Sequence, residues 1–278
     1  SFRHWPTYVR RKLMAKNRVY KENHFNDIGL KLLHRLWGIK YLHYGYFEPH
    51  QPKTIEQLPI AQENYVRIVL ENFPSSPIKD VIDIGCGVGE IANQLLDRGY
   101  KVTCVDPSRF MIESTLKKTN HRIGYRNTFY ENVDDLPSEG FDLILMSESA
   151  QYVDLDEGWV NHARHLKSGG HVVVADFFKV QEVDKPYLSK SGHFLDEMNA
   201  FAEKNGFELI KKVDITQGVD STMDIYQGII REKIFPVLEA VSEIVFRKYP
   251  LLWKTCRFFF GKKIASIYEK YNHQDGAT

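Results

Sequence analysis

The sequence contains little cysteine and no long apolar run. Its three cysteines, Cys86, Cys104 and Cys256, are odd in number, widely spaced and not at the spacing of metal ligands, which argues against a disulfide framework and against a zinc site. No run approaches the roughly 18 apolar residues that span a bilayer, and the start of the chain lacks the apolar core of a secretory signal. This composition fits a reducing, cytoplasmic setting, and we expect no bound metal.

An excess of charge of either sign is also missing. Lys and Arg together number 37 and Asp and Glu 36, which gives a net charge of +1 and no reason to expect a nucleic acid as partner. With 278 residues, 43% of them hydrophobic, the chain is long and apolar enough to bury a substantial core.

The sequence divides into three regions. Residues 1–77 are predicted to form a helical N-terminal cap or lid, which contains an aromatic stretch from Tyr41 to Pro49 and ends at Pro74-Ser-Ser-Pro77. Residues 78–215 are predicted to form the core, and residues 216–278 a mainly helical extension that completes the cap.

Short apolar runs alternate with amphipathic segments through the core region. Such runs are typical of strands buried on both faces, and they fall at Val81–Ile84, Val102–Val105, Phe141–Met146 and Val172–Ala175. Helices are expected from Glu90, from Leu155 and after Ser108 as N-cap, followed by a helix Phe194–Lys204 and a strand Phe207–Val213. The alternation predicts an α/β fold, Rossmann-like, with a mostly parallel sheet and helices on both faces.

A glycine-rich loop is the sharpest feature. The first strand runs directly into Gly85-x-Gly87-x-Gly89, and the second strand ends in Asp106, at the separation that places a carboxylate over a ribose diol. The sixth place of a dinucleotide fingerprint, normally glycine, holds Glu90, a poor neighbour for a pyrophosphate. A nicotinamide-dependent oxidoreductase stays open as an alternative, although no downstream Tyr-x-x-x-Lys pair accompanies the loop.

Over about residues 65–215, these motifs resemble the class I S-adenosylmethionine-dependent methyltransferases, closest to the tocopherol and small-molecule subgroup. Their first motif is a strand followed by Asp/Glu-x-Gly-x-Gly-x-Gly, and later motifs recur here in order, including Leu166-Lys-Ser-Gly-Gly170. The resemblance implies S-adenosyl-L-methionine as cofactor and S-adenosyl-L-homocysteine as product. The cofactor-binding residues that it implies are Asp83, Gly85, Gly87, Asp106, Met111, Asn132, Val133 and Ser147.

The acceptor side of the predicted site is expected where the fourth motif ends. Glu148 and Tyr152 are the candidate catalytic residues, because the motif places them at the mouth of the Phe141–Met146 strand. The resembling subgroup also lines its site with a Tyr-Gly-Tyr-like segment, which implies Tyr44 and Tyr46. The histidines at 34, 43, 162, 165 and 193 are further candidate bases, and no pattern selects one of them.

The resemblance predicts methyl transfer to a small-molecule acceptor. A non-catalytic S-adenosylmethionine-binding or membrane-associated module stays open as a second reading. Basic and aromatic residues gather in Ile244–Tyr268, a segment suited either to an anionic membrane or amphiphilic substrate, or to packing as a C-terminal helix. The sequence leaves the oligomeric state and the acceptor atom undetermined.

Overall fold

The computed structural model describes residues 35–37, 39–180, 192–229, 231–232 and 235–249. Their contacts divide the chain into two compact units. The first holds the described residues up to His43 and those from Gln62 to Asp214, and the second holds Tyr44–Ala61 and the described residues from Ile215 onward.

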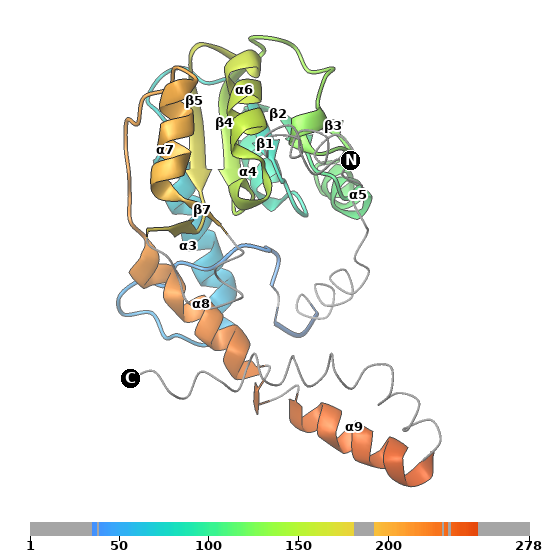
Figure 1. Cartoon of the computed structure of the whole chain (residues 1–278). Coiled ribbons are helices and arrows are strands. Elements are labelled where there is room, and N and C mark those ends of the chain that lie inside the picture. Colours follow the sequence, from blue (N-terminus) through green and yellow to red (C-terminus); the bar gives the residue numbers. More distant parts are fainter. Residues whose placement is uncertain (1–34, 38, 181–191, 230, 233–234, 250–278) are drawn as a thin grey trace, which may run out of the picture. The chain divides into compact units, whose positions relative to one another are not determined.

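A five-stranded parallel sheet organises the first unit (Figure 1). The strands are β1 (Asp80–Ile84), β2 (Lys101–Val105), β3 (Gly124–Arg126), β4 (Phe141–Ser147) and β5 (Leu166–Ala175), in the order β3-β2-β1-β4-β5. In the centre, Val81 of β1 pairs with Val102 on one side and Leu143 on the other. The strand order reverses between β1 and β4, and ligands of open α/β sheets bind beyond the carboxyl ends of the strands at such a point.

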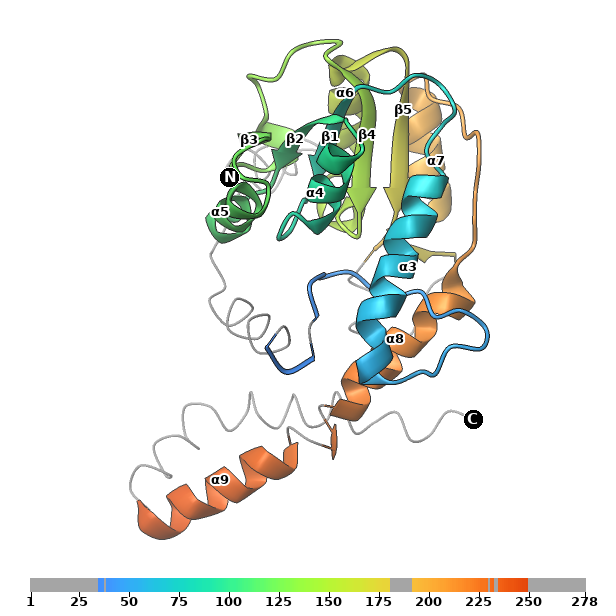
Figure 2. The ribbon, with the colours of Figure 1, turned by 180° about the vertical axis from the view of Figure 1, so that it is seen from behind.

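Helices cover both faces of this sheet, as the sequence predicted (Figures 1 and 2). On one face lie α6 (Leu155–His165) and α7 (Leu195–Lys204), and on the other lies α4 (Glu90–Asp97), which contacts α5 (Arg109–Lys118). The predicted N-cap is confirmed, because the Ser108 side chain accepts a hydrogen bond from Met111 N at 3.3 Å. β1 and β2 are therefore each followed directly by a helix, α4 and α5, that begins just beyond the carboxyl end of the strand.

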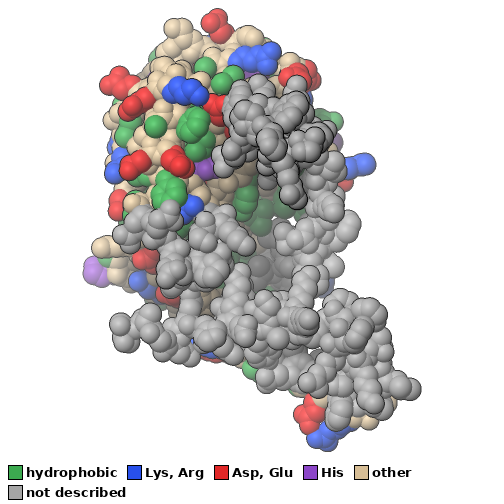
Figure 3. Space-filling view, viewed as in Figure 1, with side chains coloured by type: hydrophobic (Ala, Val, Ile, Leu, Met, Phe, Trp, Pro, Cys, Tyr) green, Lys and Arg blue, Asp and Glu red, His purple; other side chains and the backbone are tan. Residues whose placement is uncertain are grey.

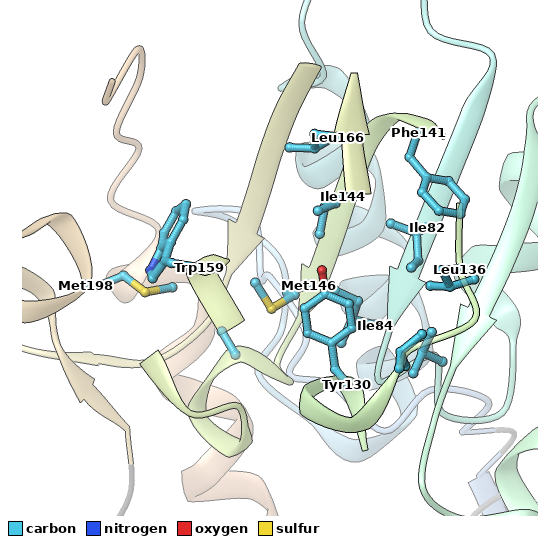
Figure 4. Packing of buried hydrophobic residues seen from close by; sticks show 13 residues of the cluster. Ile82, Ile84, Tyr130, Leu136, Phe141, Ile144, Met146, Trp159, Leu166 and Met198 are labelled. Carbon is cyan, nitrogen blue, oxygen red and sulfur yellow. The ribbon is translucent and has the colours of Figure 1, made fainter. Parts of the chain in front are cut away.

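The main core lies between the sheet and the helices α6 and α7 (Figure 4). Ile82 and Ile144 from the two central strands are fully buried, and Trp159 of α6 and Met198 of α7 pack in the same cluster. These apolar contacts fix the central strands, whose carboxyl ends carry the glycine loop and the fourth motif.

Two of the candidate histidines belong to this core. His162 is 1% exposed, its Nδ1 lies 3.0 Å from the Tyr130 hydroxyl, and burial, followed by the neighbouring His165, lowers its pKa to about 3. His165 is fully buried, with Nδ1 3.1 Å from the carbonyl oxygen of Pro137. Neither imidazole reaches solvent, so the interpretation of these two as bases is wrong. Their place on the buried face of α6 is the reason.

Two of the elements expected from the sequence are absent. The segment Phe207–Val213 forms no strand: a strand needs a hydrogen-bonded neighbour, none of the described segments pairs with it, and Leu209 and Ile210 are exposed. Within the N-terminal region, Ile39–Phe47 forms no helix, and its burial alternates from residue to residue. Burial that repeats at every second residue does not fit the 3.6-residue period of a helix.

The second unit consists of an irregular segment and helices. It contains η2 (Ile55–Gln57), the start of α3 (Leu58–Glu71), α8 (Thr216–Ile229) and α9 (Phe235–Lys248). Gly45 N donates to the Thr222 hydroxyl at 3.0 Å, Phe47 N donates to Gly218 O at 2.8 Å, and the Tyr46 ring packs on Gly218. The described part of the C-terminal region is thus helical, and the rest of Ile244–Tyr268 beyond Tyr249 lies outside the described residues.

The described surface carries both signs of charge. On the face shown in Figure 3, Lys and Arg side chains are interspersed with Asp and Glu. Among the described helices, none has the length and apolar character that crossing a membrane would require.

Truncation at the centre of the sheet should destabilise the fold strongly. We expect Ile144→Ala to lower the free energy of unfolding by about 2–5 kcal/mol, because it leaves a cavity in a fully buried position. Val160→Ala, at a position of α6 that is 52% exposed, is the matched control and should change it by less than about 0.5 kcal/mol. Urea unfolding followed by circular dichroism measures both, and equal effects would contradict the core assignment.

Candidate functional site

The glycine loop presents bare backbone at the carboxyl end of β1. Gly85 and Gly87 adopt φ of 73° and 55°, in the left-handed region that other residues avoid. Gly85 N donates to Val105 O at 2.7 Å, and a Cβ on Gly85 would overlap the Ser149 side chain. Thr115 of α5 donates to Gly87 O at 3.0 Å. The loop is therefore held from β2, α5 and the segment after β4.

Asp106 is joined to this loop by hydrogen bonds. Its Oδ2 accepts from Gly87 N at 3.3 Å and its Oδ1 from Ser108 N at 2.8 Å, and the residue is only 7% exposed. Asn127 Nδ2 donates to the Asp106 carbonyl oxygen at 2.9 Å, which fixes the backbone at the same point. The structure thus places a carboxylate beside bare backbone, the arrangement that suits the two hydroxyls of a ribose.

A second buried acid lies at the end of β1. Asp83 is 2% exposed, and its Oδ2 has no hydrogen-bond partner among the described residues. Burial, followed by the charge of Asp106, raises its pKa to about 7. The Ser147 Oγ on neighbouring β4 is also buried and lacks a partner in the described part of the chain. Two acids and an orphaned hydroxyl fit a ligand that carries positive charge and hydrogen-bond donors.

The remaining cofactor candidates occupy different places. Met111 is half-buried in the first turn of α5, and Asn132 is half-buried in η3 (Tyr130–Asn132). Val133 is 1% exposed and its side chain belongs to the core, which leaves its backbone for any ligand contact. Tyr44 and Tyr46 lie in the second unit.

The candidate catalytic residues follow β4. Glu148 has φ of 54°, a left-handed conformation that is rare outside glycine, and its N–H donates to Ala175 O at 2.7 Å. Tyr152 is 65% exposed, and partial burial, followed by the charges of Asp176 and Glu148, raises its pKa. A tyrosine with a raised pKa stays protonated at neutral pH, so Tyr152 suits a hydrogen-bond donor better than a base.

The other candidate histidines lie in different parts of the chain. His43 is 6% exposed and stacks on Tyr65 with ring centroids 4.6 Å apart. His193 Nε2 lies 3.1 Å from Ala150 O and 2.9 Å from Val153 O; because carbonyl oxygens only accept, this nitrogen carries a proton. His34 lies outside the described residues.

Two residues near these elements were missed by the sequence reading. Leu42 Cδ1 lies 3.3 Å from the position that a Cβ would take on Gly87, so this half-exposed leucine lies over the glycine loop. Asp176 follows β5 and accepts hydrogen bonds from Gln151 N at 3.1 Å and Phe177 N at 2.7 Å. The only signal for Asp176 was its position directly after a predicted strand.

Glu90 distinguishes the loop from a pyrophosphate site. It is the first residue of α4 and forms an ion pair with Lys118 of α5. A carboxylate fixed at this helix N-terminus would repel a pyrophosphate. Fold and geometry together define a Rossmann-like domain for a nucleoside ligand that bears positive rather than negative charge.

Comparison with known proteins agrees with a Rossmann-like domain that binds such a nucleoside. A family profile described as a methyltransferase domain matches residues 82–172. An O-methyltransferase of Aspergillus nomiae (rstn1) is 28% identical over 191 residues, covering 63% of this chain and 84% of that protein. Among solved structures, the geranyl diphosphate C-methyltransferase from Streptomyces coelicolor A3(2) has TM-score 0.59 and 18% identity and covers 70% and 81% of the two chains. The [4+2]-cyclase SpnF has TM-score 0.62 and 18% identity and covers 86% and 89%.

These findings support a class I S-adenosylmethionine-dependent methyltransferase, with S-adenosyl-L-methionine as its cofactor. The nicotinamide alternative is thereby set aside. The buried Asp83, its orphaned oxygen and the bare loop beside Asp106 fit this cofactor, which carries a sulfonium, an ammonium and a ribose diol.

Removing the Asp106 carboxylate should weaken cofactor binding selectively. We expect Asp106→Asn to lower the affinity for S-adenosylhomocysteine by at least about 30-fold, because hydrogen bonds to a charged acceptor contribute about 1.5–3 kcal/mol each. Isothermal titration calorimetry measures the change. Asp97→Asn, at an exposed position of α4, is the control and should bind like the parent. Unchanged affinity in Asp106→Asn would contradict the site.

Asp83 should make the stability of the cofactor-free protein fall as pH rises. A carboxyl whose folded pKa of about 7 exceeds its ordinary 3.8 stabilises the fold when protonated, and this contribution is lost as pH rises from 4 through 7. Relative to Asp83→Asn, the parent should lose up to about 1.4 kcal/mol of unfolding free energy per pH unit in this window. Urea titrations at pH 5, 6 and 7 measure this difference, and parallel pH profiles would refute the assignment.

Proposed function

We propose that this methyltransferase acts on a hydroxyl oxygen of a small acceptor with an apolar body. The curated relative from Aspergillus nomiae, named an O-methyltransferase, supports oxygen as the acceptor atom. We infer an apolar acceptor from the exposed apolar residues that follow β4 and β5. Tyr152 is 65% exposed, Phe177 40% and Val180 79%. Exposed apolar side chains in the segments after β4 and β5 suit contact with an apolar part of a ligand.

We assign the cofactor to the edge formed by β1, β2 and β4. Asp106 would hold the ribose, the loop at Gly85 and Gly87 would hold the methionine part, and Asp83 and Ser147 would complete the polar wall. Met111, Asn132 and the backbone of Val133 would flank the adenine. Tyr44 and Tyr46 lie in the second unit, and their role at the cofactor stays a prediction of the sequence resemblance.

When bound, S-adenosylmethionine supplies a methyl group on a positively charged sulfur. The protein has to align the acceptor oxygen with that methyl group, exclude water and receive the hydroxyl proton. We assign the proton to a carboxylate oxygen of Glu148, which follows β4 directly, and the donated hydrogen bond that orients the acceptor to the Tyr152 hydroxyl. The new C–O bond replaces the C–S bond, and the acceptor loses one proton, so the reaction balances.

A second reading is a protein that binds the cofactor without transferring its methyl group. One structural neighbour, SpnF, is described as a [4+2]-cyclase, so this fold is not confined to proteins described as methyltransferases. At 18% identity this likeness concerns the fold alone. We also propose that the Ile244–Tyr268 segment contacts lipid and that the protein is cytoplasmic. In the described part of that segment, Ile244 and Tyr249 are exposed.

A matched set of acceptors tests the proposed function. We expect methyl transfer to 4-butylphenol, weaker transfer to 4-methylphenol, and at least tenfold slower transfer to 4-butylaniline and 4-butylthiophenol. The butyl pair tests the apolar surface, and the three 4-butyl compounds differ only in the acceptor atom. Mass spectrometry of the methylated products, with S-adenosylhomocysteine release as a second readout, measures each rate. Cofactor binding without transfer to any of the four would favour the second reading.

A further inference from the structure

The loop that carries the candidate catalytic residues is held in a conformation that its own sequence does not favour. Glu148 is left-handed at φ of 54°, and the next residues form the short turn η4 (Ala150–Tyr152). A non-glycine residue in this region costs about 1–2 kcal/mol, and such strain persists only where the surroundings impose it. The contacts that impose it are therefore part of the site.

One side-chain contact joins this segment to the end of β1, and two others come from later segments of the chain. The Ser149 hydroxyl donates to Ile84 O at 2.5 Å, which ties the loop to the end of β1. Asp176 accepts two hydrogen bonds from Gln151 of the turn. Its Oδ2 accepts from Gln151 N at 3.1 Å, and its Oδ1 accepts from Gln151 Nε2 at 3.3 Å. Asp176 thus fastens the turn to the end of β5.

His193 donates to two backbone carbonyl oxygens of the same segment. Its Nε2 donates to Ala150 O at 3.1 Å and to Val153 O at 2.9 Å, one carbonyl on each side of Tyr152. His193 begins the short strand β7 (His193–Phe194), which pairs in parallel with β6 (Phe178–Lys179), just after Phe177. Asp176 and His193 therefore approach the turn from two segments that pair with each other.

We propose that His193 and Asp176 are positioning residues for acceptor methylation, which together hold the segment 148–153 so that Glu148 and Tyr152 face the acceptor. This inference rests on the proposed function, because it assigns those two residues to the acceptor. His193 acts through Nε2 as a donor to two carbonyls, so it is not a base at that nitrogen. Asp176 acts as an acceptor for backbone and amide N–H groups.

The test compares two replacements of His193. Glutamine keeps an amide donor where Nε2 lies, whereas leucine has similar bulk and no donor. We expect His193→Leu to lower kcat with 4-butylphenol at least tenfold, with the Kd for S-adenosylhomocysteine within twofold of the parent. His193→Gln should recover at least a third of the parent kcat. His50→Leu, at an exposed turn, is the control for a histidine-to-leucine change and should leave both values unchanged.

Hydrogen exchange separates this inference from the proposed function. The amides of Gln151, Tyr152 and Val153 are hydrogen-bonded within the turn or to Asp176, and they should exchange at least tenfold faster in His193→Leu than in the parent or His193→Gln. If the parent methylates none of the four acceptors, the proposed function fails and exchange alone decides on the positioning role. Unchanged exchange in His193→Leu, or a kcat within twofold of the parent, would overturn the inference.

Discussion

The proposed cofactor edge of this protein depends on the contact between the Gly87 amide and the Asp106 carboxylate. That hydrogen bond, at 3.3 Å, connects the carboxyl ends of β1 and β2 across the loop. It requires a backbone without side chains at the turn and an acid at the end of the next strand. The parallel register, with Asp83 opposite Cys104, brings both features to the same level of the sheet. Together with the hydrogen bond from Gly85 N to Val105 O, this contact joins the loop and the acid into one local structure.

This arrangement makes the ionised form of Asp83 unfavourable. Its burial beside Asp106 disfavours a second negative charge, which is why its pKa is raised to about 7. A ligand with positive charge would relieve that repulsion, whereas the Glu90–Lys118 pair at the start of α4 leaves no unbalanced cation there for a phosphate. The charges that disfavour this edge without a ligand are thus the ones that would favour a sulfonium over a pyrophosphate.

Elements with a strong local pattern could be predicted from the sequence, and elements that depend on distant partners could not. The apolar runs of β1, β2 and β4 and the cap at Ser108 are local, and they are confirmed. Gly124–Arg126 is short and polar, so nothing in it predicts β3; its pairing with β2 makes it a strand. Phe207–Val213 has a strand-like composition without a described neighbour to pair with, and it forms none.

The same distinction applies within the site. The glycines and Asp106 form a motif of fixed spacing, so they could be found without coordinates. Asp176 and His193 lie 25 and 42 positions after Gln151 in the sequence, and only the fold brings their hydrogen bonds to one turn. A histidine in a sequence suggests proton transfer, but His193 faces two carbonyl oxygens and must donate to both. Its chemistry is decided by its acceptors, and these are set by the parallel pairing of β6 with β7.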